Sequence, residues 1–454
     1  MTTTQRNSSA AASGNRPPAH GSTSQRSASP RRPSPRRVSR GLAAGAALLL
    51  AALTAAPALA APPTAAAPES ADVATARQGR GEGRGALLSL TPLGSLNRDE
   101  VIARARKSGL DAGTARHGVA AYRLTYRTVT PNGRPTTASG LLALPLAGGR
   151  HLPTVVHAHG TLAYRGYAPS VFAEGPDRAV SLLYASAGRA AIAPDYLGLG
   201  TSPGRHPYMD ARSAASASLD MLRAARSAAP KRGASLESKV SVTGFSQGGQ
   251  VAMELGRVLE RGADPSFRLG MLAPVGGPYD LDGSELPGMF DGRVDPRSAV
   301  FYLSFFLTAQ NRLHPLYADP SEVFRAPYAD RVEDLFDGEH PAEDIAGKLP
   351  DRLEDLLTDD WYSKLRHPSG ALLEALHAND RTCDWTPDRA IRITLYTATG
   401  DRDVPLANTR SCAGELARHG AKATVVDQGR DADHYTSFLR SAPSIARALP
   451  VSRR

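Results

Sequence analysis

The stretch VSVTGFSQGGQVAMELGRVLE, residues 240–260, carries the strongest fold signal in the chain. Its first residues are typical of a buried strand, and the residues from 247 onward have the spacing of an amphipathic helix. Between them lie Gly244, Ser246 and Gly248 in a Gly-x-Ser-x-Gly motif, which on its own occurs by chance. Its position between strand and helix is more specific, because a serine exposed on so sharp a turn needs glycines where the two elements approach. The stretch therefore predicts a nucleophilic serine, Ser246, at the end of a strand.

Apolar runs alternate with helical segments over much of the remaining chain. Strands are expected at 121–130, 136–145, 153–158, 190–194, 239–245, 268–275, 392–397 and 422–427, and helices at 98–107, 177–188, 211–228, 247–261, 406–418 and 436–448. Asn132-Gly133 predicts a hairpin between the first two strands. This pattern predicts an α/β fold, with a mostly parallel central sheet and helices on both of its faces.

Residues 282–388 interrupt the alternation, because they contain helical patterns and no convincing strand. We expect them to form an inserted helical cap, or lid, on a core of residues 88–281 and 389–454. The insert also has an apolar stripe that either lines a substrate pocket or packs in the insert's own core. The stripe consists of Phe301, Tyr302, Leu303, Phe305, Phe306 and Leu307.

A nucleophilic serine needs a base that is held in place by an acid. In this kind of fold the chain order is serine, acid, histidine. His434 is the predicted base, since it follows the last strand by a short loop and precedes the final helix. Asp401 and Asp403 both follow the strand 392–397, so position alone leaves the choice of acid open.

The oxyanion of an acyl-transfer reaction needs backbone N–H donors. We expect one from Gln247, next to the serine, and one from Thr161, beside the flexible Gly160 in the loop after strand 153–158. His157 and His159 could in principle bind zinc, but no third ligand has suitable spacing. The sequence therefore predicts no metal and no cofactor.

The formal net charge of +10 comes from 54 Lys and Arg against 44 Asp and Glu. Eight of the arginines and no acidic residue lie in residues 1–60, which leaves +2 for the rest of the chain. So nearly neutral a remainder gives no support to nucleic-acid binding. With 41% hydrophobic residues, a wholly disordered chain is also excluded.

Residues 1–60 have the character of a secretory leader. An arginine-rich stretch precedes the short apolar run 41–60, which ends in Ala58-Leu59-Ala60. This predicts export by the Sec or Tat route with cleavage after Ala60, the alternative being an uncleaved N-terminal anchor. Residues 61–87, rich in Ala, Pro, Gly and Arg, are predicted to be a flexible linker.

The chain has two cysteines, Cys383 and Cys412. In an exported protein such a pair favours one disulfide. Two buried free thiols are the alternative.

These motifs together resemble the α/β-hydrolase superfamily, and within it the secreted lipases and esterases of the secretory-lipase family. The resemblance covers most of residues 120–450 and rests on VVHAHGT, PDYLGLGTS, HPYMD, GFSQGG, GDRDVPLANT and DHYTSF. In that family two residues separate the acid from a Val-Pro pair, which favours Asp401 and keeps Asp403 as the alternative. The resemblance also implies the fold, the activity and the lid.

The predicted function is that of a secreted serine hydrolase, a lipase or esterase that cleaves carboxylic esters through an acyl-enzyme. Its expected partner is a small-molecule ester or lipid, with at most transient contact with lipid surfaces, no nucleic acid and no obligate protein partner. One alternative is an aminopeptidase-like enzyme, for which the glutamates of the insert could supply an anionic recess: Glu333, Glu339, Glu343 and Glu354. A non-catalytic binding protein with this fold is the other.

Overall fold

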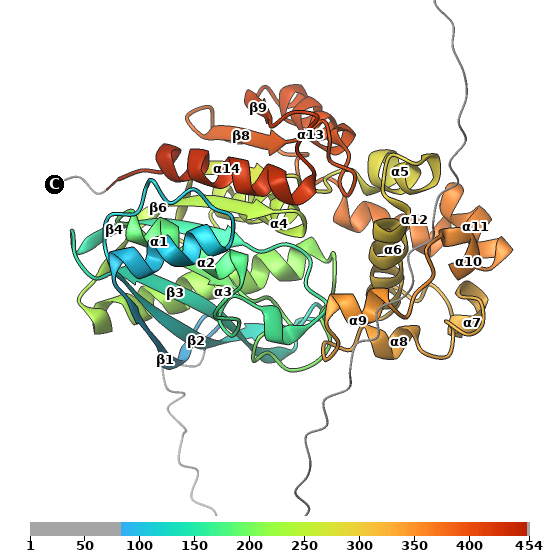
Figure 1. The fold of residues 1–454 in the computed structure, drawn as a ribbon, viewed down its shortest axis with the longest axis horizontal. Helices are drawn as coiled ribbons and strands as arrows, with labels where there is room; N and C mark the ends of the chain where they lie inside the picture. The colour runs from blue at the N-terminus through green and yellow to red at the C-terminus, as the bar shows by residue number, and fades with distance from the viewer. Residues whose placement is uncertain (1–82, 452–454) are drawn as a thin grey trace, which may run out of the picture. The chain divides into compact units, whose positions relative to one another are not determined.

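A nine-stranded sheet lies at the centre of the structure, a computed structural model that describes residues 83–451 (Figure 1). Its strand order is β1-β2-β3-β5-β4-β6-β7-β8-β9. The strands are β1 (Leu87–Leu96), β2 (Val119–Val129), β3 (Pro135–Pro145), β4 (His151–Ala158), β5 (Ala190–Pro194), β6 (Ser235–Phe245), β7 (Arg268–Val275), β8 (Arg392–Thr397) and β9 (Ala423–Asp427). The pairs from β1 through β3 to β5 are antiparallel and the others are parallel. The predicted α/β fold is confirmed. The predicted leader, residues 1–60, lies outside the described residues, and so does the predicted linker up to residue 82.

Strand β1 is absent from the sequence prediction. It begins at Leu87, a residue assigned to the linker, and pairs with β2 at the edge of the sheet. Pro92 and Gly94 break its alternation, and the register of the pairing shifts between them. An edge strand with a bulge buries little apolar surface, so it leaves a weak periodic signal in the sequence.

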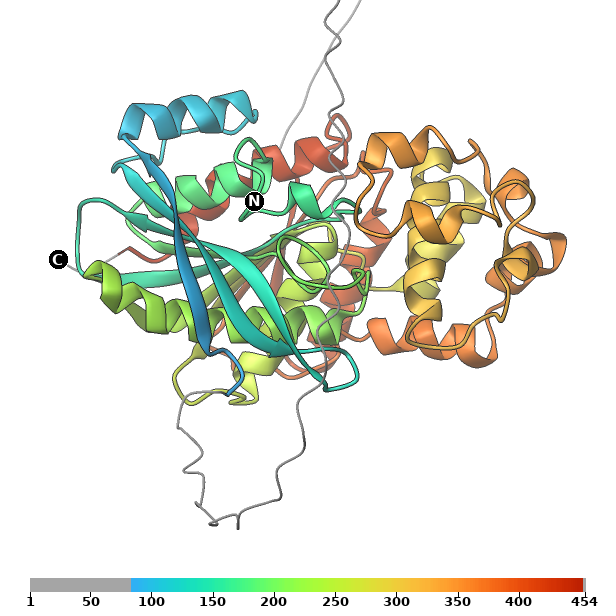
Figure 2. The same ribbon diagram turned by 90° about the horizontal axis from the view of Figure 1, so that it is seen from below.

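Helices cover both faces of the sheet, as Figure 2 shows. One layer consists of α1 (Arg98–Lys107), α2 (Pro176–Ser186) and α14 (His434–Ala448), and the other of α3 (Ala211–Ala228), α4 (Gln247–Glu260) and α13 (Leu406–Arg418). Short helical turns lie at η1 (Arg165–Tyr167) and η2 (Ala229–Arg232). Each layer forms a separate apolar core with its face of the sheet. None of the helices in residues 83–451 is both long and apolar enough to cross a membrane.

A helical segment separates β7 from β8, and we call residues 281–379 the helical insertion. It contains η3 (Leu281–Glu285), α5 (Leu286–Asp291), α6 (Pro296–Asn311), α7 (Pro320–Val323), α8 (Val332–Leu335), α9 (Ala342–Ala346), α10 (Leu353–Leu356), α11 (Asp359–Arg366) and α12 (Gly370–Asn379). These helices share an apolar core of their own, which also takes in Ala163, Tyr208 and Met209 from loops of the sheet domain. Figure 1 shows the insertion beside the ends of the parallel strands.

A disulfide joins Cys383, after the insertion, to Cys412 in α13. Both residues are fully buried in the core that α3, α4 and α13 share. The bond therefore ties the return of the chain from the insertion to the sheet domain.

Removal of this disulfide is expected to lower the free energy of unfolding. The bond closes a loop of 29 residues, which in the chain-entropy model is worth about 3–4 kcal/mol. The double variant Cys383→Ala/Cys412→Ala should lose about that amount in urea denaturation. An equal unfolding midpoint for the variant and for the oxidised native chain would contradict this expectation.

Candidate active site

Ser246 lies on a sharp turn between β6 and α4. Its φ of 57° and ψ of −124° fall where residues other than glycine are rare, and such strain costs about 1–3 kcal/mol. A Cβ on Gly244 would overlap the carbonyl oxygen of Gly248, and a Cβ on Gly248 would overlap that of Ala158. Because β4, β6 and α4 approach so closely, only glycine fits at both positions. This packing holds Ser246 in its strained conformation.

Asp401 and His434 form a buried pair. The Nδ1 atom of His434 lies 2.7 Å from Oδ2 of Asp401. The other carboxylate oxygen accepts the backbone N–H groups of Asp403 (2.9 Å) and Val404 (2.8 Å). Asp401 thus has a fixed orientation, and it is Asp401, not Asp403, that contacts the histidine. Asp403 contributes a backbone donor to that arrangement.

His434 is the first residue of α14 and lies over the Ser246 turn. Its ring centroid is 4.6 Å from that of Phe245, the residue before Ser246. On the neighbouring strand, Val275 accepts the backbone N–H of Ser246, and the next residue, Gly276, lies against the His434 ring. A Cβ on Gly276 would be 3.3 Å from Cε1 of His434. The Nε2 atom is buried and has no hydrogen-bond partner among the described residues. It is therefore free to accept a proton, and in unliganded enzymes the bond from the serine is often long.

The Asp401 carboxylate determines how His434 titrates. Burial alone would lower the pKa of His434, but the charge of Asp401 and its hydrogen bond outweigh burial and raise the pKa above its ordinary value. The imidazolium formed when the ring accepts a proton is stabilised in the same way.

A reaction that uses His434 as its base should therefore have an acid limb with its midpoint above about pH 6.5, the ordinary pKa of histidine. A base must be unprotonated, so activity is lost as the pH falls through the raised pKa of His434. The measurement is kcat/KM against pH. The Asp403 charge also contributes to the rise in pKa, so Asp403→Asn should move this limb to lower pH. A limb at or below the ordinary histidine value would contradict the prediction.

The loop after β4 brings a second peptide group next to Ser246. A Cβ on Gly160 would be 3.5 Å from Cβ of Ser246. The Nδ1 atom of His159 lies 2.7 Å from the Gly160 carbonyl oxygen. Since the two ends of a trans peptide group point in opposite directions, the N–H of Thr161 points away from His159. Sequence reasoning did not find this role of His159, which orients the predicted oxyanion donor.

Gln247 is the first residue of α4, so its backbone N–H has no acceptor within the helix. Its side-chain amide lies 3.1 Å from Nε2 of His206. Burial lowers the pKa of His206 to about 3, so the ring stays neutral. With Nδ1 donating to the Leu197 carbonyl (2.8 Å), Nε2 is left as the acceptor. His206 therefore holds the Gln247 side chain, a second contact that sequence reasoning missed.

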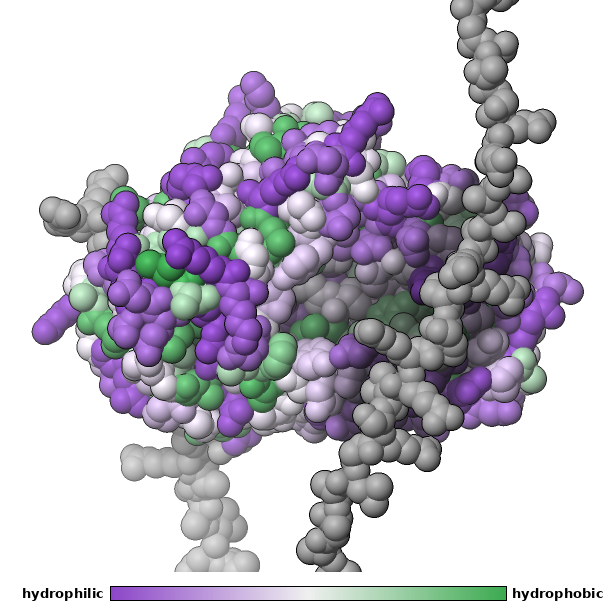
Figure 3. Space-filling view, viewed as in Figure 1, coloured by the Kyte–Doolittle hydropathy of each residue, from purple (hydrophilic) through white to green (hydrophobic). Residues whose placement is uncertain are grey.

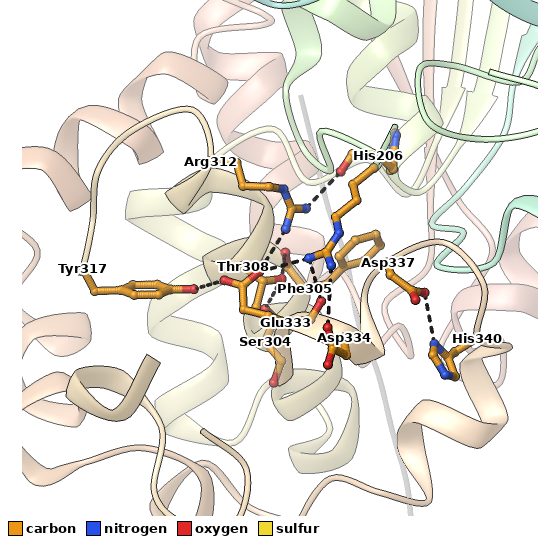
Figure 4. A network of polar contacts seen from close by, with 11 residues as sticks. His206, Ser304, Phe305, Thr308, Arg312, Tyr317, Glu333, Asp334, Asp337 and His340 are labelled. Atoms are coloured by element: carbon orange, nitrogen blue, oxygen red, sulfur yellow. Dashed lines mark hydrogen bonds and ion pairs between the residues drawn. The ribbon is translucent and has the colours of Figure 1, made fainter. Parts of the chain in front are cut away.

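A polar network joins the helical insertion to the loop before α3, which contains His206 (Figure 4). Glu333 in α8 contacts Arg312 at 3.2 Å and Arg205 at 3.4 Å, and it accepts the hydroxyl of Tyr317 at 2.8 Å. Arg312 also donates to the carbonyl of His206. The insertion is thereby connected to the residue that contacts Gln247.

A narrow cavity of about 50 Å³ opens beside Ser246. Its lining includes Thr161, Ser246 and Gln247 of the sheet domain and several residues of the insertion. Figure 3 shows a hollow where the sheet domain and the insertion meet, with apolar surface inside it. The three residues predicted for attack and oxyanion binding therefore face one pocket, together with the hydroxyl pair of Thr161 and Tyr208 (3.0 Å apart).

Both interpretations of the apolar stripe apply, since Leu303 and Phe306 line the cavity and also belong to the core of the insertion. Tyr302, Leu303 and Phe306 line the cavity. Phe305 belongs to the insertion core, where its ring stacks on those of Tyr208 (4.1 Å) and Phe336 (4.7 Å). One helix, α6, thus serves as pocket wall and as core.

His157 and His159 have protein partners. Nε2 of His157 lies 2.8 Å from Asp177, and Nε2 of His159 lies 3.2 Å from the Asp195 carbonyl oxygen. The part of the chain that the structure describes contains no group of three or more His, Cys, Asp or Glu side chains placed to hold a metal ion. The arrangement at Ser246 instead suits nucleophilic attack with proton transfer.

No protein-family model matches the chain, and no curated protein matches its sequence. Several solved structures are similar to it. The ligand-bound rice cell wall degrading esterase LipA from Xanthomonas oryzae is 28% identical, with a TM-score of 0.71, over 81% of this chain and 97% of that chain. A candidate hydrolase from Legionella pneumophila is 24% identical, with a TM-score of 0.73, over 80% of this chain and 97% of that chain.

Candida antarctica lipase A in its closed state is a more distant neighbour. It is 14% identical, with a TM-score of 0.59, over 82% of this chain and 84% of that chain. The similarities confirm the predicted resemblance to α/β-hydrolases, and the chain has the α/β-hydrolase fold.

Proposed function

We propose that this chain is a serine hydrolase that cleaves carboxylic esters through an acyl-enzyme. The observation that carries the proposal is the Asp401–His434 pair beside a serine on a strained strand-to-helix turn. An apolar cavity next to that serine suits the carbon chain of an ester.

In the proposed mechanism, the Ser246 hydroxyl attacks the ester carbonyl while Nε2 of His434 takes its proton. Asp401 keeps the Nδ1–H tautomer and stabilises the imidazolium. The backbone N–H groups of Gln247 and Thr161 donate to the oxyanion, each worth about 3–4 kcal/mol by the precedent of other serine hydrolases. His434 then protonates the departing alkoxide, and water releases the acid by the same steps in reverse.

The helical insertion has a gating role in this proposal, because several of its residues line the cavity. Substrate is a small-molecule ester or lipid, and any contact with a lipid surface is transient. Export with cleavage after Ala60 is also part of the proposal, and a structural disulfide is consistent with an oxidising compartment.

Peptide cleavage by the same machinery is less well supported. An aminopeptidase needs an acidic recess for the substrate's amino terminus, but the glutamates considered for that role have other partners and do not line the cavity. Glu333 contacts Arg205 and Arg312, Glu339 contacts Arg165, Glu343 accepts from Tyr167, and Glu354 contacts Arg352.

The test is turnover of p-nitrophenyl esters of graded acyl length beside aminoacyl anilides, with fluorophosphonate labelling in parallel. We expect ester turnover and labelling of Ser246. Anilide turnover without ester turnover would transfer the assignment to a peptidase. Absence of both turnover and labelling would favour a non-catalytic binding protein.

A further inference from the structure

One carboxyl group lies in the apolar wall of the cavity and has no part in the proposed proton transfer. Glu285 ends η3 and is 5% exposed, and it lines the same cavity as Ser246. Burial, with the nearby charges of Asp401 and Asp403, raises its pKa to about 8, although a hydrogen bond from Asn408 opposes the rise. The group is therefore mostly uncharged at neutral pH.

Asn408 in α13 fixes the orientation of this carboxyl group. The Oδ1 atom of Asn408 accepts the backbone N–H of Asp280 at 3.1 Å. Its Nδ2 must then be the donor to Oε2 of Glu285, at 2.7 Å. Oε1 makes no hydrogen bond to any residue in the described range, so it remains available to a bound molecule.

The hydrogen bond from Asn408 is the one polar side-chain contact that the described residues give the Glu285 carboxyl group. Glu285 has no ion-pair partner among residues 83–451, and Arg293, which attracts it, is paired with Asp291 at 2.8 Å. A polar group in an apolar wall is costly unless its hydrogen bonds are made.

Tyr302 of α6 lines the same cavity, and burial with the charges of Asp403 and Glu285 raises the pKa of its phenol. Two elements of the insertion thus supply polar groups to one wall.

We infer that Glu285 hydrogen-bonds a hydroxyl group on the acyl chain, so that the enzyme prefers esters of hydroxylated acids to esters of plain hydrocarbon acids. This inference rests on the proposed function and names its substrate class. Tyr302 supports the same hydroxyl group from the neighbouring helix.

A hydroxyl group fits this wall better than an ammonium group does. Transfer of an ammonium ion into an apolar cavity costs several kcal/mol, and Glu285 would have to ionise to pair with it. A neutral hydroxyl is cheaper to desolvate, and one hydrogen bond to a neutral carboxyl group can offset that cost. The carboxyl group can also donate or accept, as a hydroxyl can.

The test compares p-nitrophenyl esters of ω-hydroxy acids with unsubstituted esters of the same chain length, over graded lengths. One hydrogen bond corresponds to about a tenfold preference in kcat/KM. The native chain should prefer one hydroxylated ester by that factor. Glu285→Leu should remove the preference, measured as the ratio of kcat/KM for the hydroxylated and the plain ester in the same variant, whereas Glu285→Gln, which retains a donor and an acceptor, should keep part of it. Glu254→Gln is the matched control, since Glu254 is a buried carboxylate paired with Arg257 away from the cavity.

An unchanged preference in Glu285→Leu would overturn the inference, as would a native preference for ω-amino esters. If Glu285→Leu does not fold, as judged by its thermal transition, Tyr302→Phe decides: we expect it to weaken the preference, and no change would count against the inference. Turnover of plain esters that depends on Ser246 but shows no preference for hydroxylated ones would end this inference alone. Absence of any ester turnover by the native chain would overturn the proposed function as well.

Discussion

Ser246→Ala should lower ester turnover by about 10⁴-fold or more, as in other serine hydrolases that lose the nucleophile. No other group in the proposed mechanism can form the acyl-enzyme. Alanine has the same Cβ as serine and can be held in the same backbone conformation by the close packing around Gly244 and Gly248. The variant should therefore remain folded. The measurements are kcat with the best p-nitrophenyl ester and the temperature of unfolding.

Ser218→Ala is the matched control for this variant. Ser218 is buried too, but among the described residues its hydroxyl bonds only to the Ala214 carbonyl within α3. We expect the control to keep near-native turnover. A Ser246→Ala enzyme that retained more than about one hundredth of the activity would exclude Ser246 as the nucleophile.

Asp401→Asn should have the second largest effect, a loss of about 10⁴-fold in kcat by the precedent of the same change in a serine protease. An asparagine must present either its oxygen or its NH₂ group to Nδ1 of His434. If the NH₂ group faces Nδ1, the histidine takes the wrong tautomer. If the oxygen faces Nδ1, the NH₂ group opposes the backbone N–H groups of Asp403 and Val404. Neither orientation reproduces the contacts of the carboxylate.

Asp403→Asn is the matched comparison, because it removes a carboxylate two residues away. Asp403 contributes to this site through its backbone N–H, which the variant retains. We therefore expect less than about a tenfold loss in kcat. A larger loss in Asp403→Asn than in Asp401→Asn would identify Asp403 as the acid, and equal losses would contradict the assignment of Asp401 alone. The comparison thus tests the choice of acid independently of the nucleophile.

Most of the sheet domain could be predicted, because its parallel strands and covering helices are strongly periodic. Strands β2 to β9 and helices α1 to α4, α13 and α14 lie within a few residues of their expected bounds. Strand β1 was missed, because Pro92 and Gly94 interrupt an edge strand that buries little. At the site, sequence position could not choose between Asp401 and Asp403, because both follow the same strand.

The contacts that orient the site could not be predicted, because they join residues far apart in the chain. His159, His206 and Glu285 carry no local motif that indicates their partners. His206 meets Gln247 only when the loop before α3 packs against the start of α4. Glu285 meets Asn408 across 123 residues of sequence.

The sequence alone determined the order of strands and helices, the strand-to-helix turn at Ser246 and the interruption by a helical segment. Each of these depends on local spacing: apolar periodicity for the elements and glycine where backbones approach. Only the tertiary structure decided which aspartate contacts His434, which residues of the apolar stripe line the cavity, and that a carboxyl group lies in its wall. Those outcomes depend on distances between chain segments and on burial, and both arise only when the insertion packs on the sheet domain.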